Sequence, residues 1–183
     1  MKIADIEFKD EAFKACVLAT GCESAEEVVE LRCRKQKIKD ITGVEFLTEL
    51  KLLDLTRNSL TDVDLSKNTK LEELFLGNNA IESLDISACK ELTHLEIFMN
   101  DLEELDVSNN NLIEELWADV NDLKQLDLSN SVALTDLRVN NNNLTSLDVS
   151  ASPNLAKLLA KENPLSEQSV SSLSSLNLKQ LQL

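Results

Sequence analysis

The chain has 183 residues, of which 43% are hydrophobic, and a formal net charge of −15 at pH 7. This length and apolar content predict one folded domain with a substantial core, and they exclude an intrinsically disordered chain. No apolar run of about eighteen residues is present, so we expect no insertion into a membrane. The excess of acidic residues argues against a nucleic-acid partner, because it would repel a phosphate backbone.

The N-terminal residues, MKIADIEFKDEAF, hold one early lysine followed by acidic residues, which is not the pattern of a signal peptide. The setting is cytoplasmic if the chain is taken as it stands, and secreted or at the cell surface if a signal was removed. Asp10 is placed to cap a helix over residues 11–19, and Ser24 with Glu27 forms a capping-box pattern. We predict a helical segment over residues 1–30.

The four cysteines, Cys16, Cys22, Cys33 and Cys89, include no CxxC pair, which argues against a zinc or thioredoxin-type site. Cys16 and Cys22 are close enough in sequence to form a disulfide, but we expect both to be free thiols. The repeat register described next directs Cys33 and Cys89 inward, where a cysteine acts as a small hydrophobic residue.

From Leu50 to Leu165 the chain repeats with a period of 21 residues and without insertions. Each repeat carries the pattern LxxLxLxxNxL, whose leucine-type positions recur in every turn. A period of this kind indicates a solenoid, in which each turn stacks on the next and the apolar columns merge into one core. The asparagine column is unbroken and consists of Asn58, Asn79, Asn100, Asn121, Asn142 and Asn163.

The LxL unit alternates with period two, so it predicts a short strand whose leucines point inward. Neighbouring strands should pair in a parallel ladder. The asparagine turns the chain off the strand, and its buried amide is placed to satisfy backbone groups of its own turn and the neighbouring turn. We therefore predict an asparagine ladder along the solenoid. The second half of each repeat, with sequences such as LDLS and LDVS, indicates extended backbone without a helix.

The pattern LxxLxLxxNxL resembles the leucine-rich repeat, and the 21-residue period with its LDLS half-turn resembles the repeats of bacterial internalins. The stretch KIKDITGVEFLTELKLLDL is similar to an internalin-type turn, and the N-terminal helical segment is similar to the cap of such proteins. The resemblance implies an α/β leucine-rich repeat solenoid. Its expected form is a right-handed curved stack with a parallel sheet of about eight short strands on the concave face, a mostly extended convex side and a helical N-cap.

Within one structural domain, the cap is expected over residues 1–30 and the repeats over residues 31–165. A C-terminal helical segment and a last strand are expected over residues 166–183. The first strand should lie at residues 31–33 and the last at residues 181–183.

Residues that alternate with the inward leucines point outward from the concave sheet. The chain has five phenylalanines and one tryptophan, and three of these aromatic residues fall on this surface in adjacent turns. Clustered exposed aromatic residues with an acidic rim are typical of a protein-binding surface. Asp54 and Asp136 are expected in that rim. The predicted partner-binding residues are Phe75, Phe98, Trp117, Leu52, Leu159, His94, Glu96, Glu73, Glu115, Asp119 and Arg138.

A column of carboxylates recurs on the convex side, at Asp64, Asp85, Asp106, Asp127 and Asp148. We expect these side chains to accept hydrogen bonds from nearby backbone amides; the alternative is that calcium bridges them. The prediction is therefore no metal site and no cofactor.

Catalysis has little support in the sequence. His94 is the only histidine and could act as a base with Glu96, but the register places no nucleophile beside it. Only three glycines are present, which excludes a glycine-rich phosphate loop. We predict that the chain is not an enzyme and has no catalytic residues.

The resemblance implies a protein-recognition module that binds a protein on its concave face, as in a bacterial surface or secreted adhesin. An alternative is an intracellular acidic inhibitor or immunity-type protein that neutralises a basic toxin or enzyme. A third reading is a self-associating structural protein, although a monomer is favoured over a dimer. In the first two cases, the partner is expected to present basic residues around an apolar knob.

Overall fold

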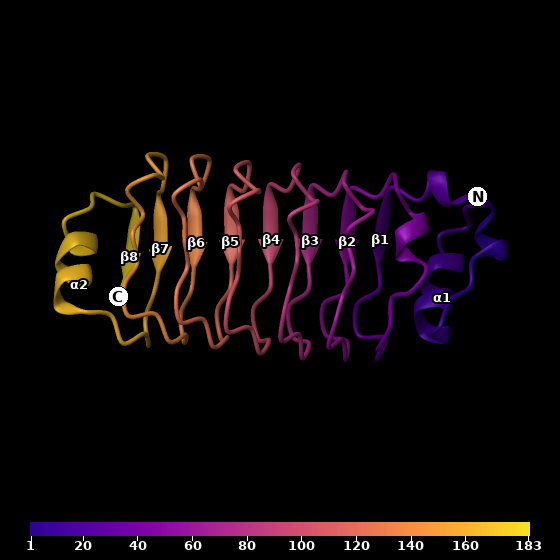
Figure 1. Cartoon of the computed structure of the whole chain (residues 1–183), viewed down its shortest axis with the longest axis horizontal. Helices are drawn as coiled ribbons and strands as arrows, with labels where there is room; N and C mark the ends of the chain where they lie inside the picture. The colour runs from indigo at the N-terminus through magenta and orange to yellow at the C-terminus, as the bar shows by residue number, and fades with distance from the viewer.

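A computed structural model describes residues 1–183, and its turns stack side by side along one axis (Figure 1). Each turn contributes one strand to a parallel sheet of eight strands in the order β1 to β8. The strands are β1 (Glu30–Arg32), β2 (Leu52–Asp54), β3 (Glu73–Phe75), β4 (His94–Glu96), β5 (Glu115–Trp117), β6 (Asp136–Arg138), β7 (Lys157–Leu159) and β8 (Gln180–Gln182). This arrangement confirms the predicted leucine-rich repeat solenoid.

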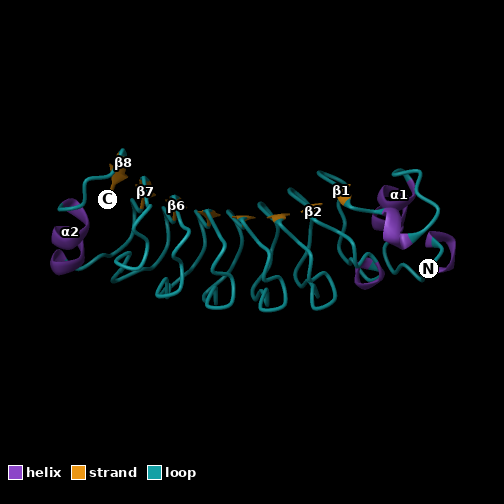
Figure 2. Ribbon diagram, turned by 90° about the horizontal axis from the view of Figure 1, so that it is seen from above, coloured by secondary structure: helices purple, strands orange, loops and turns teal.

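Two α-helices lie at the ends of the stack, α1 (Glu11–Leu18) beside β1 and α2 (Glu167–Ser174) beside β8 (Figure 1). Short 3-10 helices occupy Ile3–Asp5, Ala25–Glu27 and Val44–Phe46. Seen from above, the strands follow the inner side of a shallow arc and the loops form its outer side (Figure 2). The convex side is thus almost entirely extended, as predicted. None of the helices has the length and apolar character that crossing a bilayer requires.

The central leucines of neighbouring strands pair in register, for example Leu74 with Leu95 and Leu95 with Leu116. All three are buried and belong to a single hydrophobic cluster that runs the length of the solenoid. This continuity follows from the sequence, because an identical spacing in each turn places each leucine directly beside the corresponding leucine of the next.

The asparagine column forms a hydrogen-bonded ladder. In its central rung, the Asn100 side chain donates through Nδ2 to the carbonyl oxygens of Leu76 (3.1 Å) and Ile97 (3.0 Å). Its Oδ1 accepts from the backbone N–H of Ile81 at 3.1 Å. Each rung therefore joins two turns and satisfies backbone groups that no strand partner reaches.

A second polar ladder lies at another corner of the turn, and sequence reasoning missed it. Its buried members recur every 21 residues, at Asn68, Cys89, Asn110, Ser131 and Ser152. The amide of Asn110 donates to the carbonyls of Ile86 (3.1 Å) and Cys89 (2.8 Å), and the hydroxyl of Ser152 donates to the carbonyl of Ser131 at 2.8 Å. The mixture of Asn, Cys and Ser concealed this column, in which the side chains of all members but Ser131 donate to backbone carbonyls.

At the N-terminal end, Asp10 caps α1 by accepting from the backbone N–H groups of Ala12 and Phe13. Ser24 and Glu27 form the capping box expected from the sequence, although it opens a 3-10 helix of three residues. Phe13 is fully buried against the first turns. The cap thereby covers the apolar end of the core, which would otherwise face water.

The cysteine prediction is wrong for one pair. Cys16 of α1 and Cys33, which follows β1, form a disulfide with Cα atoms 5.9 Å apart, while Cys22 and Cys89 are free. The sequence had suggested that Cys16 and Cys22 could bridge, and that both were more simply free thiols. Packing of α1 against β1 instead brings Cys16 to the end of the first strand. Cys33 does point inward, but it is cross-linked and is not a free hydrophobic residue.

The residue before each ladder asparagine has a left-handed backbone conformation, with φ between 54° and 60° at Arg57, Asn78, Met99, Val120, Asn141 and Glu162. Asparagine tolerates this conformation, whereas a β-branched residue is strained in it. Val120 is therefore the least suited member of the column, and its side chain is 44% exposed.

Replacing Val120 by asparagine is expected to stabilise the protein by about 1 kcal/mol, because it relieves backbone strain without removing a core contact. The reverse change at the neighbouring turn, Asn141→Val, should destabilise by a similar amount. Urea unfolding curves measure both. A Val120→Asn variant that unfolds at lower urea than the wild type would contradict this account.

Candidate functional site

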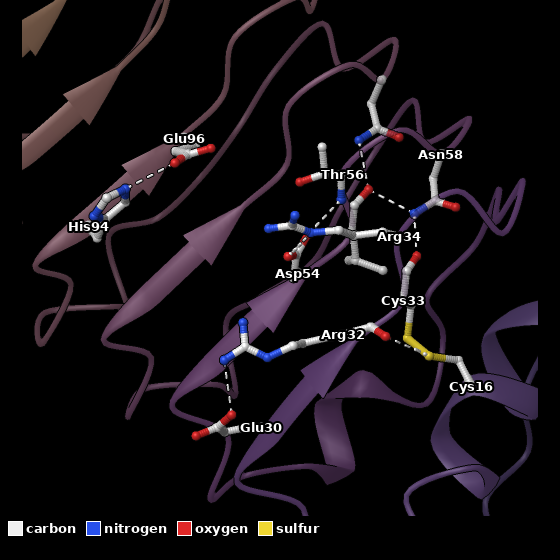
Figure 3. Close-up of polar contacts among 12 residues, drawn as sticks. Cys16, Glu30, Arg32, Cys33, Arg34, Asp54, Thr56, Asn58, His94 and Glu96 are labelled. Atoms are coloured by element: carbon white, nitrogen blue, oxygen red, sulfur yellow. Dashed lines mark hydrogen bonds and ion pairs between the residues drawn. A yellow bond between two sulfur atoms is a disulfide. The ribbon is translucent and has the colours of Figure 1, made fainter.

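The outward-facing positions of the strands line the concave face, but not all are open to solvent. Leu52 is only 6% exposed, Phe75 9% and Asp54 0%, so the prediction that these three side chains are exposed is wrong. In-register parallel strands place side chains side by side, so large neighbours cover shorter ones. Arg34, for example, lies over the carboxylate of Asp54 and forms an ion pair with it (Figure 3).

Four side chains on adjacent strands form a continuous stack across the middle of the face. The ring of Phe75 on β3 lies 5.2 Å from that of His94 on β4, which lies 5.5 Å from the ring of Trp117 on β5. The guanidinium of Arg138 on β6 lies over the ring of Trp117, 3.4 Å from the ring centre. Trp117 is consequently half-buried, and the tryptophan does not stand alone in water as the register had suggested.

Phe98 lies two residues after the end of β4 and packs over the backbone of Gly77 in the neighbouring turn. A Cβ atom on Gly77 would approach ring carbons of Phe98 at 2.6 and 2.8 Å, which is too close for any side chain. Gly77 is the only glycine in the repeats that sits on this face. It makes room for a half-exposed aromatic ring.

His94 is surrounded by carboxylates. Its Nε2 lies 3.2 Å from Oε1 of Glu96, on the same strand (Figure 3). Its Nδ1 lies 3.6 Å from Oε2 of Glu115 on β5. The hydrogen bond with Glu96 raises the pKa of His94 above its ordinary value, and the charges of Glu115 and Glu73 act in the same direction against the opposing effect of burial. The stack therefore crosses a negatively charged centre.

Both ends of the concave face are balanced in charge. On β1, Arg32 pairs with Glu30 at 3.1 Å. On β6, Asp136 accepts two hydrogen bonds from Arg138 (3.2 and 3.0 Å), and Lys157 of β7 reaches the same carboxylate at 3.4 Å. Asp136 is thus part of an ion-paired cluster and is not a free member of an acidic rim.

The two remaining predicted residues lie near this paired cluster. Asp119 accepts from the backbone and side-chain nitrogens of Asn140, at 2.9 and 2.6 Å, so its position is fixed by the next turn. Leu159 on β7 is half-exposed and extends the face beyond Arg138.

Two exposed apolar residues beside the face were missed by sequence reasoning. Met99 (46% exposed) and Val120 (44%) lie on adjacent turns, directly after the concave positions Phe98 and Asp119. Their turns are joined here by the backbone N–H of Asn100, the residue after Met99, which donates to the carbonyl of Val120. The signal was present in the sequence, since these are the only two apolar residues in the otherwise polar column that precedes the ladder asparagines.

The convex carboxylate column has the simpler of its two predicted roles. Each aspartate accepts a hydrogen bond from the backbone N–H of the serine two residues later, as Asp106 does from Ser108 at 2.8 Å. The same contact recurs at 2.9 Å for Asp64, Asp85, Asp127 and Asp148. Hydrogen bonds from Ser108 also lower the pKa of Asp106, so the carboxylates hold local turns while ionised. No group of three His, Cys, Asp or Glu side chains is arranged to hold a metal ion.

Comparison with known proteins agrees with these features. Residues 101–123 match the family model described as Leucine Rich Repeat. The functional domain of InlJ from Listeria monocytogenes, described as including a cysteine ladder, is similar in structure, with a TM-score of 0.59 and 27% identity. That match covers 96% of this chain and 50% of the InlJ chain, so the chain spans half the length of that relative.

Internalin C2 from Listeria monocytogenes is similar over 97% of this chain and 93% of its own, with a TM-score of 0.66 and 25% identity. The LRIM1/APL1C complex contains a chain of the same fold, with a TM-score of 0.64 and 23% identity over 70% of this chain and 26% of that one. No curated protein sequence matches the chain. By its repeats and its fold, the chain is similar to the bacterial internalin-like leucine-rich repeat proteins.

Proposed function

We propose that the chain is a protein-recognition module whose concave face binds a protein partner around Trp117. Leucine-rich repeat proteins of this fold act in protein–protein interaction. The observation that carries the proposal is the half-exposed aromatic surface of Phe98 and Trp117, set among carboxylates on a rigid sheet. Aromatic residues of this kind dominate binding energy at protein interfaces. A partner with an apolar knob ringed by basic residues fits this face.

The disulfide between Cys16 and Cys33 favours one setting for this function. Disulfides persist in oxidising environments such as the cell surface, the periplasm or the extracellular space. The cross-link in the cap therefore supports a surface or secreted adhesin-type protein.

An acidic intracellular inhibitor of a basic toxin or enzyme is the second candidate, because the net charge of −15 would accelerate encounter with a basic protein. Two measurements separate the candidates. Thiol counting on protein isolated from its native source would show Cys16 and Cys33 oxidised in the first case and reduced in the second. Light scattering against concentration would identify self-association, the third reading, as growth in mass.

Replacing Trp117 by serine is expected to abolish partner binding while costing about 1–2 kcal/mol of stability through loss of its stacking on His94 and Arg138. The assay is a binding screen of surface-exposed and secreted proteins against the wild type, with each hit repeated against the variant. Leu112→Ser is the matched control, since it removes an exposed leucine that lies outside the strands. Partners that bind the Trp117→Ser variant as tightly as the wild type would refute the concave site.

A further inference from the structure

The centre of the concave face carries negative charge that the chain does not neutralise. Glu73 on β3, Glu96 on β4 and Glu115 on β5 occupy three adjacent strands. No lysine or arginine nitrogen lies within 4.0 Å of these carboxylates, and the only basic group that contacts Glu96 or Glu115 is His94. The ends of the same face have paired charges, so this imbalance is confined to the middle. We call these three glutamates and His94, with the neighbouring ring of Trp117, the acidic–aromatic centre.

The partly exposed ring of Trp117 gives this centre the character of a cation site. Electron-rich ring faces attract an ammonium or guanidinium group and shield it from water. The chain already pairs this tryptophan with such a group, because the guanidinium of Arg138 lies over its ring at 3.4 Å. The same ring lies 5.5 Å from that of His94, which is itself 3.6 Å from the carboxylate of Glu115. A cation entering here would meet charge and an aromatic surface together.

We propose that the acidic–aromatic centre receives an arginine or lysine side chain of the protein partner, in competition with the proton of His94. This inference rests on the proposed function and names the chemistry of the contact. A protonated imidazole beside Glu96 and Glu115 neutralises part of the charge that attracts the incoming cation. A neutral imidazole leaves all three carboxylates available.

The direction of the pH dependence follows from the groups that face His94. These are Glu73, Glu96 and Glu115, and beyond the tryptophan ring Arg138 of β6. Because the carboxylates favour the charged imidazole, His94 stays protonated to a higher pH than an ordinary histidine. Affinity for a basic side chain should thus rise as pH increases through the pKa of His94. By linkage, the bound cation should lower that pKa.

Two short peptides test the proposal directly. One is acetyl-Leu-Arg-Leu-amide, and the other has citrulline in place of arginine, which keeps the shape and removes the charge. The ring resonances of His94 report both binding and its pKa, and they are unambiguous because the chain has one histidine. We expect the arginine peptide to shift these resonances and lower the pKa, and to bind about five- to tenfold more tightly near pH 8.5 than near pH 6. The citrulline peptide should do neither.

Variants separate a specific site from general attraction to an acidic protein. Glu73→Gln/Glu115→Gln should weaken the arginine peptide several-fold. The charge-matched control Glu49→Gln/Glu103→Gln alters two glutamates that pair with Lys70 and Lys124 away from the centre, and it should change little. His94→Gln should bind the peptide with an affinity that no longer varies between these pH values.

Three results would overturn the inference. The first is an equal response of the His94 resonances to both peptides, and the second is an unchanged pKa of His94 at the highest peptide concentration. The third is an equal loss of affinity for the arginine peptide in the two double variants. If protein partners still bind in a Trp117-dependent manner under those outcomes, the proposed function stands and only the cation contact fails. If Trp117-dependent partners are absent while the peptides behave as expected, the proposed function fails instead.

Discussion

Replacing Asn100 by alanine is expected to lower the free energy of unfolding by about 2–3 kcal/mol. The side chain is 7% exposed and bonds groups from two turns. Its loss leaves the N–H of Ile81 without the acceptor it has at 3.1 Å, and removes the donor shared by the carbonyls of Leu76 and Ile97. Buried backbone groups left without partners retain their desolvation cost and gain nothing in return.

The measurement is equilibrium unfolding in urea, followed by circular dichroism. Asn111→Ala is the matched control, because Asn111 is exposed and outside the ladder, so its replacement should change stability by less than about 0.5 kcal/mol. Asn100→Asp adds a finer test. It keeps the acceptor for Ile81 but turns a carboxylate oxygen toward two carbonyls, so it should be no more stable than the alanine variant at neutral pH. Equal midpoints for Asn100→Ala and Asn111→Ala would refute a stabilising ladder.

Removing the disulfide, in the double variant Cys16→Ala/Cys33→Ala, is expected to cost about 3 kcal/mol. The bridge spans a sequence separation of 17 residues, and it ties α1 to the end of β1. Without it, the unfolded chain gains the entropy of an open loop. Cys33 is also joined to the ladder, since its carbonyl accepts from Nδ2 of Asn58 at 2.8 Å (Figure 3). Loosening the cap should therefore weaken the first turns.

Unfolding with and without a reducing agent measures this effect. Reductant should destabilise the wild type as much as the double variant is destabilised, and it should leave that variant unchanged. Cys22→Ala is the control, because Cys22 is free and half-buried. Burial raises the pKa of the Cys89 thiol to about 11, so in the native protein only Cys22 should react with a thiol reagent. Four reactive thiols in unfolded, unreduced protein would show that the bridge is absent.

The fold was predictable because each 21-residue repeat places its leucines and its asparagine at the same positions. The 21-residue period placed the strands within one residue of their positions, from β1 at Glu30–Arg32 to β8 at Gln180–Gln182. Small errors of assignment do not accumulate in such a chain, since each turn contacts only its neighbours. The helices at both ends were also indicated by local signals, such as the Asp10 cap.

The candidate surface was predicted only in outline. The alternation of LxL identified the residues that face the concave side, but not how much of each remains exposed. The side chains of Phe75 and Leu52 are buried by their neighbours. Met99 and Val120, which follow the LxL residues of their repeats, are exposed to solvent. Exposure depends on the size and direction of side chains one turn away, which are 21 residues distant in sequence.

The sequence by itself determined the solenoid, its register and the asparagine column, because these depend on spacing along the chain and on the physical need to bury leucines and satisfy backbone groups. Only the tertiary structure decided which residues meet between turns: the pairing of Cys16 with Cys33, the stack from Phe75 to Arg138, and the carboxylates around His94. The reason is that these contacts join residues of different identity on neighbouring elements. Their geometry follows from packing across the stack, and no pattern along one strand contains it.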